Sequence, residues 1–138
     1  MPEVTALYPD LLLDHSKNPR NFGALPDATR SAHRNNPFCG DALTVHLKLS
    51  ADRIVDARFE GAGCAISVAS ASMMTISVTG KTRGEAQALA EQIERLVTGS
   101  ASAADGLGEL AVLGQVAEFP VRVECARLAW FALLAALS

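Results

Sequence analysis

The chain has 138 residues, of which 49% are hydrophobic and 20% charged, so it can bury a core and is not expected to be disordered. Its net charge of −3 excludes the basic footprint typical of nucleic-acid binding. Three cysteines without a secretory signal favour a cytoplasmic protein with reduced thiols, and the longest apolar run, residues 128–137, is too short to span a membrane. We therefore expect one domain over residues 1–138, with neither nucleic acid nor membrane as a partner.

The first half of the sequence predicts one helix and three strands. Apolar residues at helical spacing favour a helix over residues 4–16, and a short edge strand is predicted at 28–34. Odd positions from 43 to 49 are apolar and the even ones from 42 to 50 mostly polar, which predicts a half-buried central strand over 41–49. Residues 54–60 are close enough to pair with it as an antiparallel hairpin. The inward residues of that last strand are predicted to be Val55, Ala57 and Phe59.

The second half predicts helices. A glycine-rich turn leads into a helix over 64–78, whose apolar face is expected to contain Ile66, Ala69, Met73 and Ile76. Thr82 and Glu85 have the spacing of a capping box and start the next helix. A short helix is predicted at 107–113 and a last one at 122–137. The expected fold class is α+β, a small antiparallel sheet with helices packed on it.

The candidate functional site begins at the mouth of the central strand. Cys39 and Asp41 both have its inward parity. Burying a lone carboxylate is costly unless a charge partner or a metal is present, so this pair suits a divalent cation. Cys64 and Cys125 could complete a shell of four ligands.

The local positions of the thiols support metal binding. Cys64 lies at a strand-to-helix turn and Cys125 is expected in the first turn of the last helix, where free N–H groups lower a thiol pKa. Three thiolates and a carboxylate would make a tetrahedral zinc shell with a formal charge of about −2, which Arg122 is placed to offset. Spacing alone leaves open that each cysteine is a small buried hydrophobe, since none belongs to a CxxC pair.

The histidines are weaker candidates for metal binding. His46 has outward parity and is expected to be solvated. His15 ends the first predicted helix and can complement its dipole. His33 lies near the site in sequence but is not expected to bind a metal.

Several ordered motifs cover most of the chain: residues 14–21 (DHSKNPRN), 36–41 (NPFCGD), 56–67 (DARFEGAGCAIS), 69–74 (ASASMM), 80–81 (GK), and 119–122 (FPVR) leading to Cys125. Together they resemble the SufU branch of the iron–sulfur cluster assembly family that also includes IscU and the N-terminal part of NifU. The long interval between Cys64 and Cys125 resembles the SufU insertion. The IscU branch carries a histidine just before its last cysteine, where this chain has Glu124.

This resemblance implies a three-stranded antiparallel sheet with helices on one face. It implies a zinc-dependent sulfur acceptor that works with a cysteine desulfurase, a SufS-like pyridoxal-phosphate enzyme, and with downstream iron–sulfur assembly proteins. By similarity, the zinc ligands are Cys39, Asp41, Cys64 and Cys125. Cys39 would accept the persulfide sulfur, and Arg122 would help at the docking surface. Asp41 is a harder and weaker zinc ligand than a thiolate, so the shell should open more easily than a four-cysteine site.

Two other interpretations remain open at this point. The same four residues could hold iron or a [2Fe–2S] cluster, which would make the protein a scaffold that passes clusters to apo-proteins. Alternatively, the protein could be a non-catalytic adaptor in which zinc only holds the fold.

Overall fold

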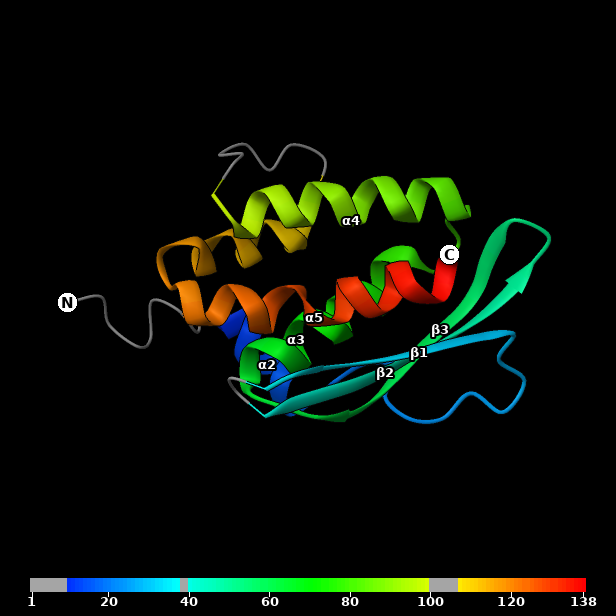
Figure 1. The fold of residues 1–138 in the computed structure, drawn as a ribbon, viewed down its shortest axis with the longest axis horizontal. Helices are drawn as coiled ribbons and strands as arrows, with labels where there is room; N and C mark the ends of the chain where they lie inside the picture. Colours follow the sequence, from blue (N-terminus) through cyan, green and yellow to red (C-terminus); the bar gives the residue numbers. More distant parts are fainter. Residues whose placement is uncertain (1–9, 38–39, 100–106) are drawn as a thin grey trace.

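The structure is a computed structural model that describes residues 10–37, 40–99 and 107–138. Its elements follow in chain order: α2 (Asp10–Lys17), β1 (Arg30–Asn36), β2 (Asp41–Ser50), β3 (Arg53–Ala62), α3 (Ala65–Val78), α4 (Arg83–Val97), the 3-10 helix η1 (Gly108–Glu118) and α5 (Pro120–Leu137). The strands form one antiparallel sheet in the order β1-β2-β3. Helices lie on one side of this sheet (Figure 1), which confirms the predicted α+β class.

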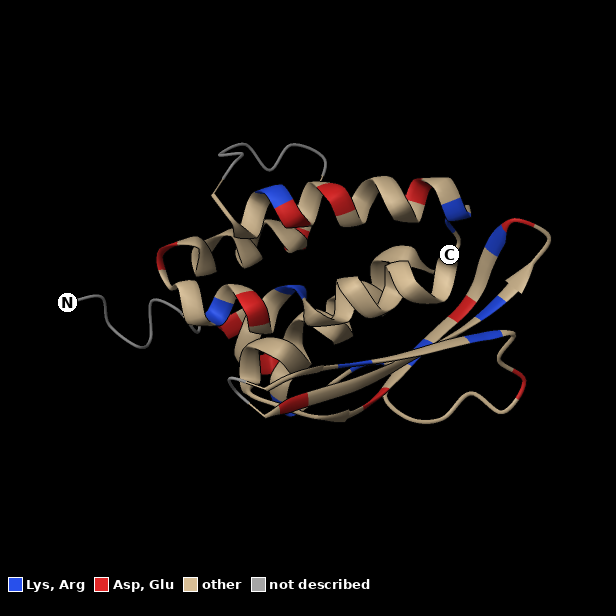
Figure 2. Ribbon diagram, viewed as in Figure 1, with Lys and Arg blue, Asp and Glu red and all other residues tan. Residues whose placement is uncertain are grey.

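The helices form layers above the sheet. α5 contacts β1 and β2, and α3 contacts β3, so these two helices cover the inner face of the sheet. α4 packs on α5 and η1 on the side away from the sheet (Figure 1). Charged residues of both signs lie along α4 and along the β2–β3 hairpin (Figure 2). Among the described residues, no helix is both long and apolar enough to cross a membrane.

The alternation predicted for the central strand is confirmed. Leu43, Val45 and Leu47 of β2 are fully buried, and the even residues between them are partly exposed. Asp41, the first residue of β2, continues this inward set and is only 1% exposed. Because side chains alternate along a strand, the Asp41 carboxylate faces the core at one end of the sheet.

The parity predicted for the third strand is wrong at Val55, which is 43% exposed, while Ile54 is fully buried. The cause is a register shift between Lys48 and Leu49: Lys48 pairs with Asp56, but Leu49 pairs with Ile54. The extra residue forms a bulge, and a shift of one residue reverses which side chains face the core.

The predicted helices are present with shifted bounds. α2 begins at Asp10, and residues 4–9 of the expected first helix lie outside the described residues. The short helix expected at 107–113 is η1, which continues to Glu118, and α5 begins at Pro120 because proline is well accommodated in the first turn of a helix.

The helix α3 does not have the single apolar face that was predicted. It is contacted by α2, α5 and β3, so buried residues occur almost all round it, whereas Ile76 is 50% exposed. The capping box of α4 is confirmed: Thr82 Oγ1 accepts a hydrogen bond from Glu85 N at 3.2 Å, and Glu85 Oε1 accepts one from Thr82 N at 2.9 Å.

Candidate metal centre

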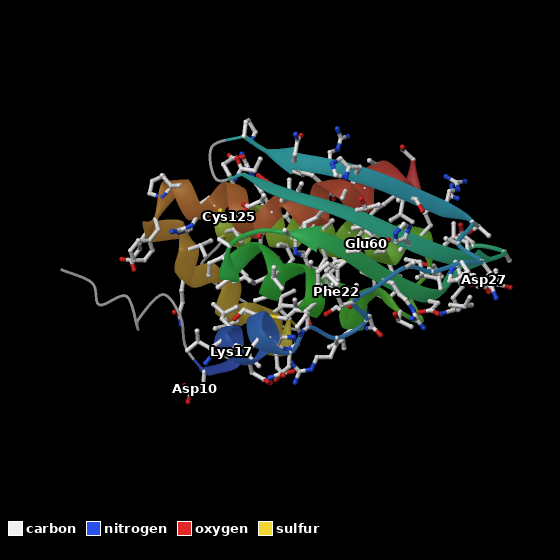
Figure 3. The ribbon with its side chains drawn as sticks, turned by 90° about the horizontal axis from the view of Figure 1, so that it is seen from below. Asp10, Lys17, Phe22, Asp27, Glu60 and Cys125 are labelled. Carbon is white, nitrogen blue, oxygen red and sulfur yellow. The ribbon has the colours of Figure 1, made fainter. Side chains whose placement is uncertain are left out.

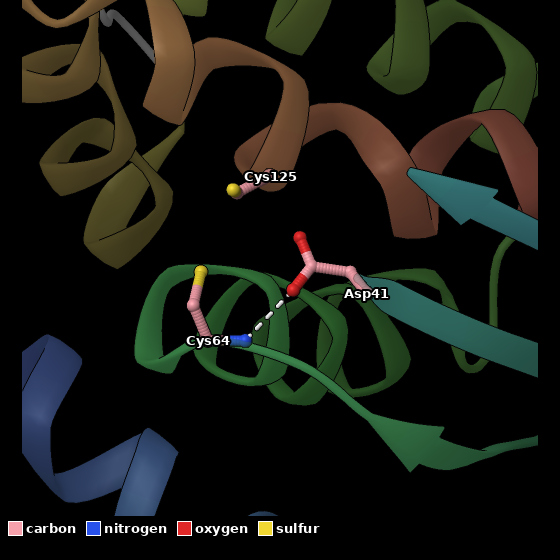
Figure 4. A group of neighbouring side chains, drawn as sticks. All are labelled: Asp41, Cys64 and Cys125. Carbon is pink, nitrogen blue, oxygen red and sulfur yellow. Dashed lines mark hydrogen bonds between the residues drawn. The ribbon is translucent and has the colours of Figure 1, made fainter. Parts of the chain in front are cut away.

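Three potential metal ligands converge from three separate elements (Figure 4). Asp41 opens β2, Cys64 is the N-cap of α3, and Cys125 lies in α5. One ligand atom from each lies within 4.8 Å of the others. The fourth predicted ligand, Cys39, lies outside the described residues.

Asp41 is held by the backbone at the start of α3. Its Oδ1 accepts a hydrogen bond from Cys64 N at 2.8 Å. The other carboxylate oxygen points toward Cys125 (Figure 4). Because one oxygen is fixed by an N–H group, the carboxylate is oriented and its second oxygen is directed toward Cys125.

Gly63 permits this close contact between the strand and the helix. A Cβ at this position would lie 2.7 Å from Asp41 Oδ1 and 2.2 Å from Ser67 Oγ. Neither distance leaves room for a side chain. A glycine just before Cys64 is therefore required for the carboxylate to reach the start of α3.

The Cys64 thiol has the environment of a reactive cysteine. Its pKa is lowered to about 6, chiefly by a hydrogen bond from Cys125, with further help from the backbone N–H groups of Ile66 and Ser67. Burial and the nearby Asp41 carboxylate act in the opposite direction. The free N–H groups at the start of α3 therefore contribute to the lowered pKa of Cys64, but the hydrogen bond from Cys125 contributes more, and a thiolate fraction is expected near neutral pH.

Cys125 is fully buried, and its predicted position in the first turn of the last helix is wrong. Because α5 begins at Pro120, Cys125 lies in the second turn, beyond the free N–H groups. Side chains supply donors instead. Asn36 Nδ2 lies 3.8 Å from Cys125 Sγ, and Arg122 Nη1 lies 4.0 Å from it, so the expected cation is beside this thiol.

The donor set fits a thiophilic metal. In tetrahedral zinc sites with Zn–S bonds of about 2.3 Å, neighbouring sulfurs lie about 3.8 Å apart. Ligand atoms within 4.8 Å of one another can therefore close around one ion with small movements. Two sulfurs and one oxygen suit zinc or iron better than magnesium or calcium, which prefer oxygen ligands.

Glu124 does not belong to this group of ligands. Its carboxylate forms an ion pair with Arg127, which also pairs with Glu94 of α4. Where the IscU branch has a histidine next to its last cysteine, this chain therefore has a glutamate that is paired with Arg127 within α5.

His15 lies in the last turn of α2, as predicted. It is also buried, at 4% exposed, and its Nδ1 forms a hydrogen bond with Ser72 Oγ at 2.7 Å, so it joins α2 to α3. Burial is the main reason why its pKa is lowered from the ordinary value of 6.5.

The other histidines lie on the open face of the sheet, which Figure 3 shows together with Glu60. His33 is exposed and bonded to Thr44 Oγ1 at 2.8 Å. His46 faces outward as predicted, but its side chain is only 16% exposed because Ser31 and Glu60 bind its two ring nitrogens. Neither belongs to the group of potential metal ligands among the described residues.

Sequence reasoning missed Asn36 and Gly63. Asn36 is 5% exposed and lies opposite Asp41 in the β1–β2 pair. An asparagine before a proline is typical of a turn, and only the structure shows that the Asn36 side chain reaches Asp41 and the Cys125 thiol. The sequence indicated that Gly63 belongs to a glycine-rich turn, but it did not indicate that this glycine lies against the Asp41 carboxylate.

Comparison with known proteins identifies relatives over nearly the whole chain. Residues 7–138 match the model of the NifU-like N terminal domain. The "Iron-sulfur cluster assembly scaffold protein IscU" of Streptococcus pyogenes serotype M1 is 43% identical over 138 residues, covering 99% of this chain and 86% of that protein. The "Zinc-dependent sulfurtransferase SufU" of Bacillus subtilis (strain 168) is 42% identical over 131 residues, covering 94% of this chain and 88% of that protein.

A similar fold is known from a crystal structure. FiSufU from the thermophile Fervidobacterium islandicum AW-1, described as an iron–sulfur cluster assembly scaffold for the SUF system, superposes with a TM-score of 0.92 at 33% identity. The match covers 99% of this chain and 100% of FiSufU.

Proposed function

This chain belongs to the family of NifU-like N-terminal domains, and we propose that it acts in iron–sulfur cluster assembly as a zinc-dependent acceptor of persulfide sulfur. The observation that carries the proposal is the convergence of the ligand atoms of Asp41, Cys64 and Cys125, which lie within 4.8 Å of one another. The similarity to a zinc-dependent sulfurtransferase supports it.

We assign the metal to four residues: Cys39, Asp41, Cys64 and Cys125. Bound zinc would keep the cysteines as thiolates and damp their reactivity until a partner ligand displaces one of them. The chain prepares the site before metal binds, because Cys64 N fixes the Asp41 carboxylate and the Arg122 guanidinium lies beside the Cys125 sulfur. Arg122 offsets part of the negative charge that several anionic ligands accumulate.

The reaction proposed for Cys39 is thiol exchange with a persulfide. Its thiolate attacks the outer sulfur of a persulfide carried by a cysteine desulfurase. A new S–S bond forms on Cys39 as the S–S bond on the desulfurase breaks, and the cysteine of the desulfurase leaves as a thiolate. The net change is the transfer of one sulfur atom, with no external oxidant or reductant.

The surface near the site offers access to such a partner. A groove of about 480 Å³ runs between the end of β1 and α5, and Asn36, Glu124 and Phe131 are among its lining residues. Val121, one residue from Arg122, is 62% exposed. The desulfurase, downstream assembly proteins and a cytoplasmic location are parts of this proposal.

We also propose that residues 1–138 form a single domain. The buried apolar residues form one continuous cluster that includes β2, β3 and all helices from α2 to α5, which supports one domain over residues 1–138. No separate core is needed for either half of the described chain.

A second candidate function is the assembly of a [2Fe–2S] cluster on the same ligands. The similarity to a protein named as an IscU scaffold favours it, and thiolates are the usual ligands of such clusters. One feature counts against cluster assembly. The IscU branch carries a histidine at the position of Glu124, next to the last cysteine, and in this chain the Glu124 carboxylate is paired with Arg127.

One experiment separates the two functions. The zinc-loaded protein is incubated with a cysteine desulfurase and cysteine, and the intact and peptide masses are measured. We expect one added sulfur, located on Cys39. If no sulfur is added, but reconstitution with iron and sulfide gives a stable visible cluster spectrum and transfer to an apo-acceptor, the scaffold function is correct.

A further inference from the structure

We propose that Asn36 is a positioning residue of the metal centre, whose side-chain amide holds Asp41 and Cys125 at the separation that a metal needs. This inference rests on the proposed function, because it concerns the same site. Asn36 is the last residue of β1 and does not itself supply a metal ligand of the kind assigned above.

The contacts of the amide reach two ligands from different parts of the chain. Asn36 Nδ2 lies 3.5 Å from Asp41 Oδ2 and 3.8 Å from Cys125 Sγ. Oδ2 is the carboxylate oxygen that the backbone of Cys64 leaves unbound, since Cys64 N binds Oδ1. Asn36 and Cys64 therefore each hold one oxygen of the same carboxylate.

The chemistry of an amide explains why asparagine suits this position. A side-chain amide carries two N–H donors and no charge, so a single Nδ2 can serve two acceptors at once. The two acceptors here are a carboxylate and a thiol that becomes a thiolate, and these groups repel each other when both are ionised. A neutral donor between them reduces that repulsion without adding a cation that would compete with the metal.

Burial and strand register make this contact fixed. Asn36 is only 5% exposed, and it lies opposite Asp41 in the antiparallel pair of β1 and β2. Its backbone oxygen accepts a hydrogen bond from Gly40 N at 2.9 Å. Backbone and side chain are thus both anchored, which is what a residue that orients ligands requires.

The test compares variants at two neighbouring asparagines. Asn36→Ala removes the amide, and Asn36→Leu removes it while keeping a branched side chain with the same number of heavy atoms. Asn35→Ala is the matched control, because Asn35 is the exposed neighbour in the same strand. For each full-length protein, zinc affinity is measured by competition with a chromophoric chelator, thiolate ligation by the charge-transfer band of bound cobalt(II), and stability by thermal unfolding of the metal-free form.

We expect zinc affinity to fall about 10–100-fold in both Asn36 variants and to stay unchanged in Asn35→Ala. The cobalt(II) charge-transfer band should weaken or shift in the Asn36 variants, while the metal-free unfolding temperature stays close to that of the control. Unchanged affinity and an unchanged cobalt(II) spectrum overturn the proposal. A fall in affinity that only accompanies an equal loss of metal-free stability also overturns it.

Failure of the proposed function gives a different result. If the wild-type chain binds no zinc and no cobalt(II) at its thiols, both the function and the role of Asn36 are wrong. If the wild type binds metal and accepts sulfur while the Asn36 variants bind metal equally well, only the role of Asn36 is wrong.

Discussion

The backbone N–H of Cys64 donates a hydrogen bond of 2.8 Å to Asp41 Oδ1, joining residues that are 23 positions apart in the sequence. This bond connects the start of β2 to the start of α3, and it orients a carboxylate that is 1% exposed toward two thiols. The metal centre therefore depends on a backbone contact as well as on its ligands.

Asp41→Asn should separate metal binding from folding. An asparagine oxygen can still accept the Cys64 N–H, so the metal-free protein should fold, but a neutral amide is a poorer ligand than a carboxylate. We expect the rise in unfolding temperature on adding zinc to be smaller than in the wild type, because ligand-induced stabilisation follows affinity. Thermal unfolding with and without zinc checks this. An equal zinc-induced rise would mean that Asp41 is not a ligand.

Gly63→Ala should destabilise the protein and weaken its metal site. The added Cβ would meet Ser67 Oγ at 2.2 Å and Asp41 Oδ1 at 2.7 Å, so the chain must shift. Overpacking of this kind costs about 1–3 kcal/mol in the free energy of unfolding. Gly84→Ala is the control, because a Cβ there meets no atom within 4 Å and alanine favours a helix. Chemical denaturation measures the free energy of unfolding of both variants. Equal changes in Gly63→Ala and Gly84→Ala would contradict the close contact at Gly63.

The sign of the charge at residue 122 should affect metal retention. Arg122 Nη1 lies 4.0 Å from Cys125 Sγ. Arg122→Glu therefore replaces a cation that stabilises the Cys125 thiolate with an anion that repels it. We expect zinc affinity to fall by about tenfold or more in Arg122→Glu, and to fall little in Arg122→Lys. Competition with a chelator measures the change at low and high salt. Equal zinc affinities in Arg122→Glu and Arg122→Lys would show that the charge of Arg122 does not affect metal binding.

His15 should make the stability of the fold depend on pH. Burial lowers its pKa below 6.5 in the folded protein, so the unfolded chain takes up a proton at His15 more readily than the folded one. The free energy of unfolding is then fully maintained above 6.5, falls as the pH drops below this value, and levels off below the lowered pKa.

The control for this effect is another histidine. His15→Gln should flatten the dependence of unfolding free energy on pH between 5 and 7, a range set by the ordinary histidine pKa of about 6.5. His33→Gln should leave the dependence in place, because His33 is exposed. Denaturation curves at several pH values measure this. A slope that survives in His15→Gln would place the titrating group elsewhere.

Much of the fold could be predicted because local patterns control it. The alternation along β2 identified the inward residues and Asp41 among them, and the capping box marked the start of α4. The error at Val55 came from a bulge, which changes parity without a clear local signal. The position of His15 at the end of the first helix could be predicted, but its burial could not, because that depends on Ser72, which is 57 residues away.

Less of the metal site than of the fold could be predicted from local sequence patterns. Parity made Asp41 a candidate, but spacing left the role of the cysteines open, and only the resemblance to a family selected the set of ligands. The structure shows that Cys64 and Cys125 meet Asp41 because α3 and α5 both pack on the same sheet. The contribution of Asn36 depends on the pairing of β1 with β2, which the sequence does not state.

The most direct test of the central claim is mass analysis of the zinc-loaded protein after reaction with a cysteine desulfurase and cysteine, with wild type and Cys39→Ala compared side by side. We predict one zinc per chain, one added sulfur on Cys39 of the wild type, and none on Cys39→Ala. Transfer that proceeds fully in Cys39→Ala, or sulfur added only at Cys64 or Cys125, would contradict the proposal that Cys39 accepts the persulfide sulfur.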